Sequence, residues 1–224
     1  MAKRISILGS TGSIGVNTLA VIDQLDEDLE VVYLSAYKNT EKIIEQAKKY
    51  RPQAVAVIND SSAAEVKNGL AGESIDVLMG RKGLLEISQR DDVDLLMNGL
   101  VGSAGMEPTL NAVKVGVDVA LSNKESLVMA GDIINRTKEK TGASIYPVDS
   151  EHSAIWQCLT GERLEEVRRI ILTGSGGPFR TRDLKTFSDI TLNEALNHPN
   201  WNMGKKITID SATMMNKGLE VIEA

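Results

Sequence analysis

Short runs rich in β-branched residues alternate with amphipathic runs along most of the chain. The first kind predicts strands, at residues 4–9, 29–36, 53–58, 75–80, 93–100, 117–122 and 143–149. The second kind carries apolar residues at helical spacing, at residues 14–25, 40–50, 62–70, 83–90, 107–116 and 125–140. A repeated order of strand, helix and strand is typical of a parallel sheet with helices on both faces. We therefore expect an α/β fold with a Rossmann-like, doubly wound parallel sheet.

The alternation ends near residue 150, where we expect a domain boundary. The later pattern predicts a helix at 153–159, strands at 167–174 and 205–211, an irregular stretch at 178–204, and a helix from 214 onward. We expect residues 1–150 to form one domain and residues 151–224 to form a smaller, truncated α+β domain. The last predicted helix runs to Ala224 without a glycine, an asparagine or a basic last turn that would end it. We therefore expect the sequence to belong to a longer protein.

Composition narrows the possible classes of protein. The chain has 224 residues and a formal net charge of −6, which allows a proper core but argues against a nucleic-acid or anionic-membrane surface. Its single cysteine, Cys158, excludes an internal disulfide and is expected to be an inert core thiol. No stretch is long enough to span a membrane, and the first strand begins too early for a signal peptide. We expect a soluble, cytoplasmic protein that binds neither nucleic acid nor membranes.

A glycine-rich loop joins the first predicted strand to the first helix. It places Gly9, Gly12 and Gly15 in the sequence "ILGSTGSIG". Glycines at such a turn let backbone N–H groups approach a pyrophosphate, which then lies at the start of the helix. This spacing therefore indicates a dinucleotide site, and the alternative is a tight turn without a ligand.

The end of the second predicted strand indicates which dinucleotide is bound. Enzymes that use NAD usually carry an acidic residue there, which binds the ribose hydroxyls. This chain has Lys38 and Asn39 at that place, and a lysine charge beside an amide suits a 2′-phosphate. NADP is therefore favoured, and the alternative is that Lys38 is a solvated loop lysine.

The stretch "PVDSEHSA" (147–154) combines two carboxylates with one of the two histidines of the chain. In extended backbone Asp149 and Glu151 would face one side, and a shared cation would separate their charges. The alternative is a helix cap formed by Asp149 or Ser150. Since ligands of doubly wound folds collect beyond the carboxyl ends of strands, Asn123, Lys124 and Glu125 are expected to converge with the two carboxylates.

The last third of the chain is dense in phosphate-binding groups. Ser175 lies on a glycine turn, and Ser211, Asn216 and Lys217 bring hydroxyl, amide and ammonium donors. Glu220 follows one helical turn after Asn216 and offers a third carboxylate. Three carboxylates without a cysteine favour Mg²⁺ or Mn²⁺ over zinc.

Six motifs of this chain together resemble one enzyme family. They read "GSTGSIG", "NKESLV", "PVDSEHSA", "LTGSGGPF", "NHPNW" followed by "MG" after one residue, and "DSATMMNKGLE". In this order they resemble the 1-deoxy-D-xylulose 5-phosphate reductoisomerase family. The likeness runs from the first strand to the last residue, but the carboxyl-terminal helical domain of the family is absent.

The resemblance implies a role for each residue that matches a family motif. The implied metal ligands are Asp149, Glu151 and Glu220, which are also the implied catalytic residues together with Lys124 and His152. The implied substrate-binding residues are Lys124, Ser150, Glu151, Ser175, His198, Trp201, Ser211, Asn216, Lys217 and Glu220. The implied cofactor-binding residues are Thr11, Gly12, Ser13, Ile14, Lys38, Asn39, Asn123, Glu125, Met203 and Gly204. Trp201 and Met203 match a mobile lid of the family, although the sequence alone would place Trp201 in a core. His152 either assists the site or packs behind it.

The family's reaction follows from the same resemblance. It implies conversion of 1-deoxy-D-xylulose 5-phosphate to 2-C-methyl-D-erythritol 4-phosphate in non-mevalonate isoprenoid biosynthesis, with NADPH and a divalent cation. It also implies a homodimer. Residues 1–150 would then form the NADP-binding domain and residues 151–224 the catalytic domain. Two alternatives remain: a semialdehyde dehydrogenase, which would need a cysteine nucleophile and no metal, and a non-catalytic dinucleotide sensor, which would not need three carboxylates.

Overall fold

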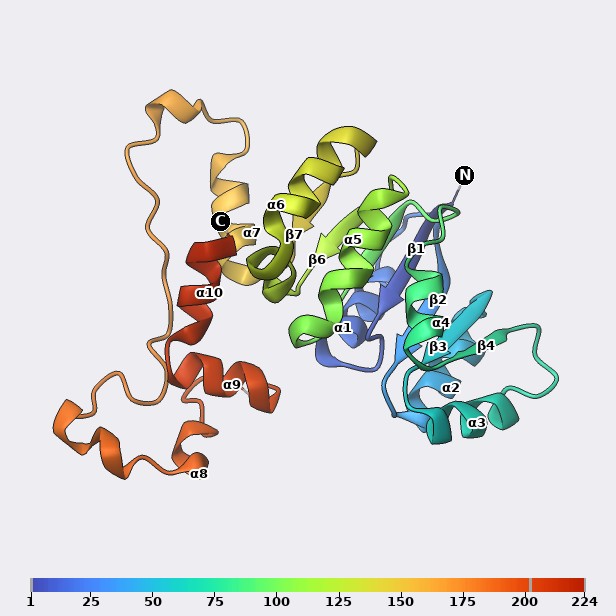
Figure 1. The fold of residues 1–224 in the computed structure, drawn as a ribbon, viewed down its shortest axis with the longest axis horizontal. Coiled ribbons are helices and arrows are strands. Elements are labelled where there is room, and N and C mark those ends of the chain that lie inside the picture. The colour runs from blue at the N-terminus through green and yellow to red at the C-terminus, as the bar shows by residue number, and fades with distance from the viewer. Residues whose placement is uncertain (1, 202, 224) are drawn as a thin grey trace. The chain divides into compact units, whose positions relative to one another are not determined.

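The computed structural model describes residues 2–201 and 203–223 (Figure 1). The chain divides into two compact units, one up to Asp149 and one from Ser150 onward. The expected boundary at residue 150 lies one residue after this division. Each unit is described by itself below.

The first unit holds a seven-stranded parallel sheet in the order β4-β3-β2-β1-β5-β6-β7. The strands are β1 (Lys3–Leu8), β2 (Leu29–Ala36), β3 (Ala54–Val57), β4 (Asp76–Met79), β5 (Leu95–Asn98), β6 (Asp118–Leu121) and β7 (Ile145–Pro147). Each lies within two residues of its expected ends, so the prediction of a doubly wound parallel sheet is confirmed.

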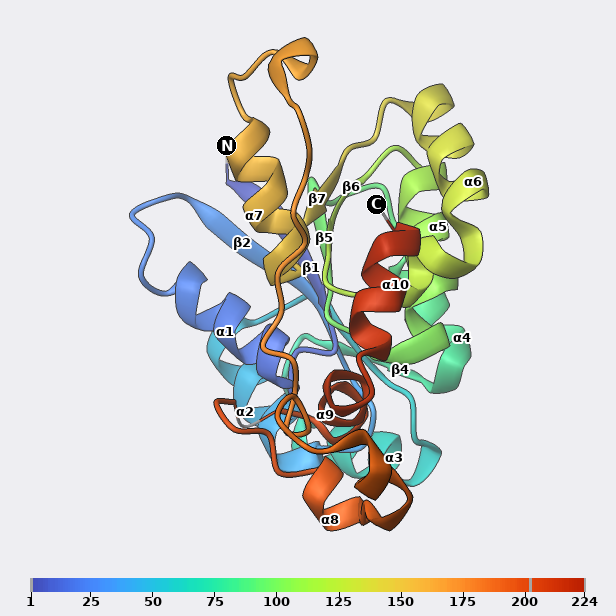
Figure 2. The same ribbon diagram turned by 90° about the vertical axis from the view of Figure 1, so that its left-hand side faces the viewer.

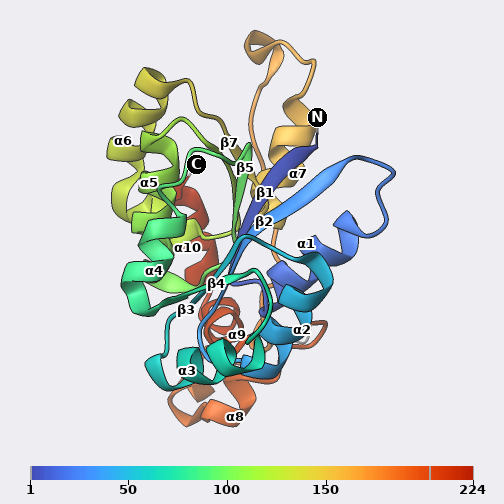
Figure 3. The same cartoon turned by 90° about the vertical axis from the view of Figure 1, so that its right-hand side faces the viewer.

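Helices cover both faces of this sheet. They are α1 (Ser13–Ile22), α2 (Thr40–Tyr50), α3 (Asp60–Gly69), α4 (Gly80–Ile87), α5 (Met106–Lys114) and α6 (Lys124–Thr141), with a short 3₁₀ helix at Gly102–Gly105. One buried apolar cluster joins α4, α5 and α6 to the sheet, and a second joins α1, α2 and α3 to it. Figure 3 shows α4 and α5 on one side of the strands and α1 and α2 on the other.

The sheet changes direction between β1 and β5. From β1 the chain proceeds outward to β4, and it then returns to form β5 on the other side of β1. The loops that follow these two neighbouring strands are therefore side by side, and the amide of Gly99 donates a hydrogen bond of 3.0 Å to the Leu8 carbonyl. In this class of fold, such a switch point is where ligands bind.

The second unit contains helices and extended segments but no strand among its described residues. Its helices are α7 (Ser150–Leu159), α8 (Leu192–Ala195), α9 (Lys205–Ala212) and α10 (Met215–Glu223), with short 3₁₀ helices at Leu164–Glu166 and Leu184–Asp189. Figure 2 shows a long trace between α7 and α8 that forms no sheet. No helix of the described residues is long and apolar enough to cross a bilayer.

Two expected strands of this unit are wrong, each for its own reason. Residues 167–174 are without regular structure, because no described strand runs beside them to form a ladder. Residues 205–211 lie in α9, whose buried positions Thr208, Ser211 and Ala212 have helical spacing. The apolar alternation of Ile207 and Ile209 suggested a strand, but Ile207 is 42% exposed and the small polar residues form the inner face.

Candidate active site

The glycine loop after β1 is tightly packed. Gly9 has φ +76°, and a Cβ atom there would lie 3.0 Å from the Gly99 carbonyl oxygen. A Cβ atom on Gly15 would lie 2.4 Å from Cα of Ser10, which no side chain tolerates. The loop therefore needs glycine at both ends, because α1 starts directly against it.

The start of α1 differs from that of three other helices of the first unit. Asn39, Asn59 and Asn123 cap α2, α3 and α6 by accepting hydrogen bonds from backbone amides. Gly12 occupies the same position before α1, and the described residues supply no side-chain cap there. Uncapped amides and the helix dipole together suit an anionic group such as a pyrophosphate.

The polar residues after β2 have separate roles. The Asn39 side chain accepts a hydrogen bond of 3.2 Å from the Lys42 amide, so this predicted cofactor contact is engaged in a cap. Lys38 is exposed and follows β2, the strand next to β1. An exposed side chain fits both expectations for Lys38, a contact to a 2′-phosphate and a solvated loop lysine. Thr11, Ser13 and Ile14 lie in the glycine loop and at the start of α1.

The start of α6 joins two further strand ends. Asn123 is 1% exposed; its amide donates to the carbonyl oxygens of Leu100 and Gly102 at 3.0 and 2.8 Å, and to Glu125 Oε2 at 3.2 Å. Its side chain thus fastens α6 to the segment after β5. Lys124 forms an ion pair of 2.8 Å with Asp149, and their side chains are 16% and 11% exposed.

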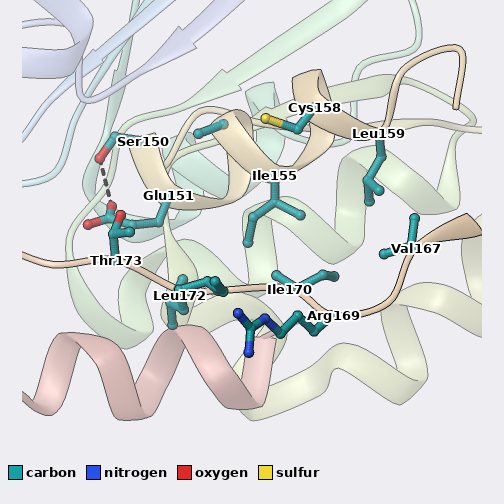
Figure 4. Close-up of a pocket in the computed structure, with 12 residues that line it drawn as sticks. Ser150, Glu151, Ile155, Cys158, Leu159, Val167, Arg169, Ile170, Leu172 and Thr173 are labelled. Atoms are coloured by element: carbon teal, nitrogen blue, oxygen red, sulfur yellow. Dashed lines mark hydrogen bonds between the residues drawn. The ribbon is translucent and has the colours of Figure 1, made fainter.

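In the second unit an ammonium group joins two of the predicted metal ligands, Glu151 and Glu220. The Lys217 ammonium, on α10, donates hydrogen bonds to the Glu151 carboxylate and, at 2.7 Å, to Glu220 Oε2. Glu220 is 1% exposed, so its charge must be balanced where it lies. Ser150 donates a hydrogen bond of 2.7 Å to the other oxygen of Glu151, as Figure 4 shows. We call Glu151 and Glu220 the acid pair.

Asp149, the third predicted ligand, ends the first unit. Two residues of chain span at most about 7 Å between Cα atoms, so Asp149 lies near Glu151 by connectivity alone. The extended backbone expected at this place is wrong, because Ser150 and Glu151 begin α7.

His152 packs against the last helix of the described chain. Its Nε2 lies 3.2 Å from the Glu220 carbonyl oxygen, and its Nδ1 lies 3.3 Å from Glu223 Oε2. These contacts tie α7 to α10 behind the carboxylate of Glu220. The structure therefore gives His152 a supporting contact, while its direct part in catalysis stays a prediction.

The predicted phosphate-binding residues gather around the glycine turn at 174–177. Ser175 Oγ lies 3.1 Å from His198 Nε2 and accepts a hydrogen bond of 3.2 Å from the Gly177 amide. The amides of Asn200 and Trp201 donate to His198 Nδ1, which leaves the proton of a neutral ring on Nε2, facing Ser175. The Ser175 hydroxyl hydrogen can then be donated to a ligand.

The same turn packs against α9 and α10. A Cβ atom on Gly177 would lie 2.5 Å from the Ser211 carbonyl oxygen, and one on Gly174 would lie 2.7 Å from Cε of Lys217. Asn216 Oδ1 is buried without a hydrogen-bond partner among the described residues. We call Ser175, His198, Ser211, Asn216 and Lys217 the cradle residues.

The residues that were predicted to form a lid, Trp201 and Met203, are not buried. Trp201 is 66% exposed, so the alternative that it belongs to a core is wrong. Met203 accepts a hydrogen bond of 3.5 Å from Thr208 Oγ1, and Gly204 precedes α9 as its N-cap residue. Residue 202 of this stretch and the predicted helix end at Ala224 lie outside the described residues.

Two features of the second unit were missed from the sequence. A groove of about 450 Å³ runs between α7 and residues 167–173, lined by apolar side chains such as Ile155 and Leu172 (Figure 4). Cys158 lines this groove and is exposed, so the expectation of a core thiol is wrong. The second feature is a polar cluster in which Arg182 pairs with Glu194. Part of it could have been predicted, because the motif "TLNE" (191–194) is typical of a capping box.

Two family models match the chain. One, described as 1-deoxy-D-xylulose 5-phosphate reductoisomerase, matches residues 5–131, and the other, described as the C-terminal domain of that enzyme, matches residues 145–224. The chain is 57% identical over 222 residues to the 1-deoxy-D-xylulose 5-phosphate reductoisomerase of Chloroherpeton thalassium and 51% identical over 222 residues to that of Thermoanaerobacter sp. strain X514. These alignments cover 99% of this chain but 57% and 58% of the relatives, so the chain spans little more than half their length.

Solved structures agree with these relatives. A DOX-P reductoisomerase in complex with NADPH, fosmidomycin and magnesium matches with a TM-score of 0.91 and 40% identity. The 1-deoxy-D-xylulose 5-phosphate reductoisomerase of Zymomonas mobilis in complex with NADPH matches with a TM-score of 0.90 and 41% identity. The matches cover 99% and 100% of this chain and 57% of each of those chains.

Proposed function

Because this chain belongs to the 1-deoxy-D-xylulose 5-phosphate reductoisomerase family, we propose that it carries the NADPH-binding and catalytic parts of such an enzyme. The enzyme isomerises and reduces 1-deoxy-D-xylulose 5-phosphate to 2-C-methyl-D-erythritol 4-phosphate. The observation that carries this proposal is the acid pair held by one ammonium group beside a glycine turn rich in donors.

The first unit is proposed to bind NADPH at the switch point. The amides at the start of α1 hold the pyrophosphate, and the fit is supported by the missing side-chain cap and by glycines where a Cβ atom would clash. Lys38 binds the 2′-phosphate through its charge. NADPH, when bound, supplies the hydride that reduces the substrate.

The divalent cation is proposed to bind Asp149, Glu151 and Glu220. The fit is supported by the donor set, which consists of carboxylate oxygens alone, and by the acid pair, which already shares a positive charge at Lys217. When bound, the cation polarises the ketone of the substrate as a Lewis acid. Either Mg²⁺ or Mn²⁺ suits these oxygens, and we propose both as cofactors.

The cradle residues are proposed to hold the substrate phosphate. Ser175 donates through its hydroxyl hydrogen, Lys217 brings a charge beside Gly174, and Asn216 is proposed to add its amide N–H group. Lys124 and Ser150 are proposed to contact the sugar hydroxyls. A phosphate held at one end keeps the reacting carbons in register during the rearrangement.

Replacing Asp149 by Asn tests the metal site. We expect the variant to bind Mn²⁺ more weakly by isothermal titration, while NADPH binding stays unchanged because different residues hold the cofactor. Asp132→Asn, on an exposed position of α6, is the matched control. Unchanged Mn²⁺ affinity in the Asp149 variant would contradict the proposed ligand set.

A homodimer and a cytoplasmic location complete the proposal. Both rest on the family resemblance and on the composition of the chain. Light scattering of the longest natural protein that contains this sequence tests the first, and cell fractionation tests the second.

A further inference from the structure

The segment between two cradle residues, Ser175 and His198, has almost no apolar core. Among residues 176–197 only Gly177 and Ala195 are buried. Its large apolar side chains, such as Leu184 and Leu192, are 77% and 67% exposed. Nevertheless, Ser175 Oγ and His198 Nε2 lie 3.1 Å apart. Polar contacts, together with one contact between the rings of Phe179 and Phe187, therefore hold this segment, which we call the connecting segment, in one conformation.

Arg182 makes the hydrogen bond that joins the most distant parts of this segment. Its Nη1 donates to Glu194 Oε1 at 2.7 Å, its Nη2 to the Thr186 carbonyl oxygen at 3.1 Å, and its Nε to Thr186 Oγ1 at 3.1 Å. The guanidinium also lies 5.7 Å from the ring centroid of Phe179. The side chain is 23% exposed. One guanidinium thus joins the turn after Gly177, the 3₁₀ helix at Leu184–Asp189 and α8.

Glu194 connects Arg182 to α8, the helix that precedes His198. Its Oε2 accepts hydrogen bonds from the amide and the hydroxyl of Thr191, both at 2.8 Å, in a capping box that starts α8. Hydrogen bonds from the Thr191 backbone and side chain, and from Arg182, lower the pKa of Glu194 to about 2. The carboxylate therefore stays charged at neutral pH. The helix that it caps ends at Ala195, three residues before His198.

We propose that Arg182 is a positioning residue that holds the connecting segment folded, so that His198 and Ser175 meet before a phosphate arrives. This inference rests on the proposed function of the cradle residues. Without Arg182, the incoming phosphate would have to order the segment itself, and the entropy lost in that step would weaken binding. The effect should concern the phosphate group and not NADPH, which binds in the other unit.

The test compares Arg182→Met with Arg182→Lys, Lys185→Ala and Ser175→Ala in the longest natural protein that contains this sequence. Met keeps the apolar part of the arginine side chain and removes the guanidinium group. Lys retains the positive charge beside Glu194 but not the hydrogen bonds to Thr186. Lys185 lies in the same segment with an exposed side chain, so its replacement controls for the lost charge. Inorganic phosphate and NADPH are titrated by calorimetry, and hydrogen exchange of the connecting segment is measured without ligand.

We expect Arg182→Met to weaken phosphate binding by roughly tenfold, as for a lost charged hydrogen bond, and to speed exchange in residues 183–197. Arg182→Lys should give an intermediate affinity, Lys185→Ala no change, and NADPH affinity should stay constant in all. KM for the sugar phosphate should rise more than kcat falls.

Three results would overturn the proposal. Normal phosphate affinity in Arg182→Met, with loss in Ser175→Ala, would leave the cradle intact and remove the role of Arg182. Unchanged exchange despite weaker binding would make Arg182 a direct phosphate contact. Normal affinity in both variants would reject the cradle itself and the proposed function with it. If Arg182→Met does not fold, Glu194→Gln, which keeps the shape of the side chain, is expected to act in the same direction, and normal affinity and exchange in that variant would overturn the proposal equally.

Discussion

The first unit buries large apolar side chains on both faces of its sheet, whereas the largest fully buried side chain of the described second unit is that of Glu220. In α7 none of the ten residues is buried. Burial of apolar surface stabilises the first unit whether or not a ligand is bound. Hydrogen bonds and ion pairs order the second unit, and the side chains that form them can also bind a metal or a phosphate. Outside the glycine loop, stability and the proposed ligand binding are thus separate in the first unit, and they are combined in the second.

The largest expected effect is the loss of core packing in the first unit. Ile7 is 0% exposed, and Ile7→Ala should lower the free energy of unfolding by about 2–5 kcal/mol. Leu184→Ala in the second unit, at 77% exposure, should change it by no more than about 0.5 kcal/mol. Denaturant titration of both variants measures the contrast, and an equal loss would show that the second unit has an apolar core after all.

The next effect concerns the 2′-phosphate. Lys38→Ala should weaken NADPH binding by about 1.5–3 kcal/mol, the range of a charged hydrogen bond, and leave NADH binding unchanged. Fluorescence titration with the two cofactors measures it. An equal loss for both would mean that Lys38 shapes the loop and does not read the phosphate.

A slightly smaller effect is expected at the glycine loop. Gly15→Ala places a Cβ atom 2.4 Å from Cα of Ser10, so it should lower the free energy of unfolding by about 1–3 kcal/mol and weaken NADPH binding as the loop shifts. Gly131→Ala is the matched control, because its Cβ atom would meet nothing within 4 Å. Cofactor binding should be normal in the control, and normal binding in both would exclude the loop from the site.

The smallest effect is a pH dependence in the second unit. The pKa of Glu194 is lowered from 4.5 to about 2, so folding favours its charged form. The stability that this carboxylate contributes is fully present above pH 4.5 and is lost as the pH falls toward 2. Hydrogen exchange of α8 should therefore differ between the natural chain and Glu194→Gln at pH 6, and the difference should shrink on acidification. A difference independent of pH would assign the effect to shape and not to charge.

Much of the first unit was predictable because local signals agree with the fold. β-branched runs mark its buried parallel strands, and asparagines stand where α2, α3 and α6 begin. The capping role of Asn123 could have been read in the same way, but its place at a strand end suggested a ligand contact.

The second unit was less predictable because its order depends on residues far apart in the chain. The motifs indicated carboxylates and groups that donate hydrogen bonds to a phosphate. They did not indicate that Lys217 joins Glu151 to Glu220, although these two residues are 69 positions apart in the sequence. Alternating apolar residues at 205–211 predicted a strand, since the pattern cannot show that Thr208 and Ser211 are the ones buried. A strand at 167–174 would need a neighbour, and no local pattern can supply one.

The burial of Glu220 predicts how substitutions at this position affect the amount of folded protein in a cell. A survey of all substitutions that scores only protein abundance should find position 220 as intolerant as Ile7, because an unbalanced or oversized group there disrupts the second unit. Position 38 should tolerate most changes in the same survey. Abundance would then identify the proposed metal ligand Glu220 and miss the proposed cofactor contact Lys38. Only a screen that scores cofactor binding separately would identify Lys38.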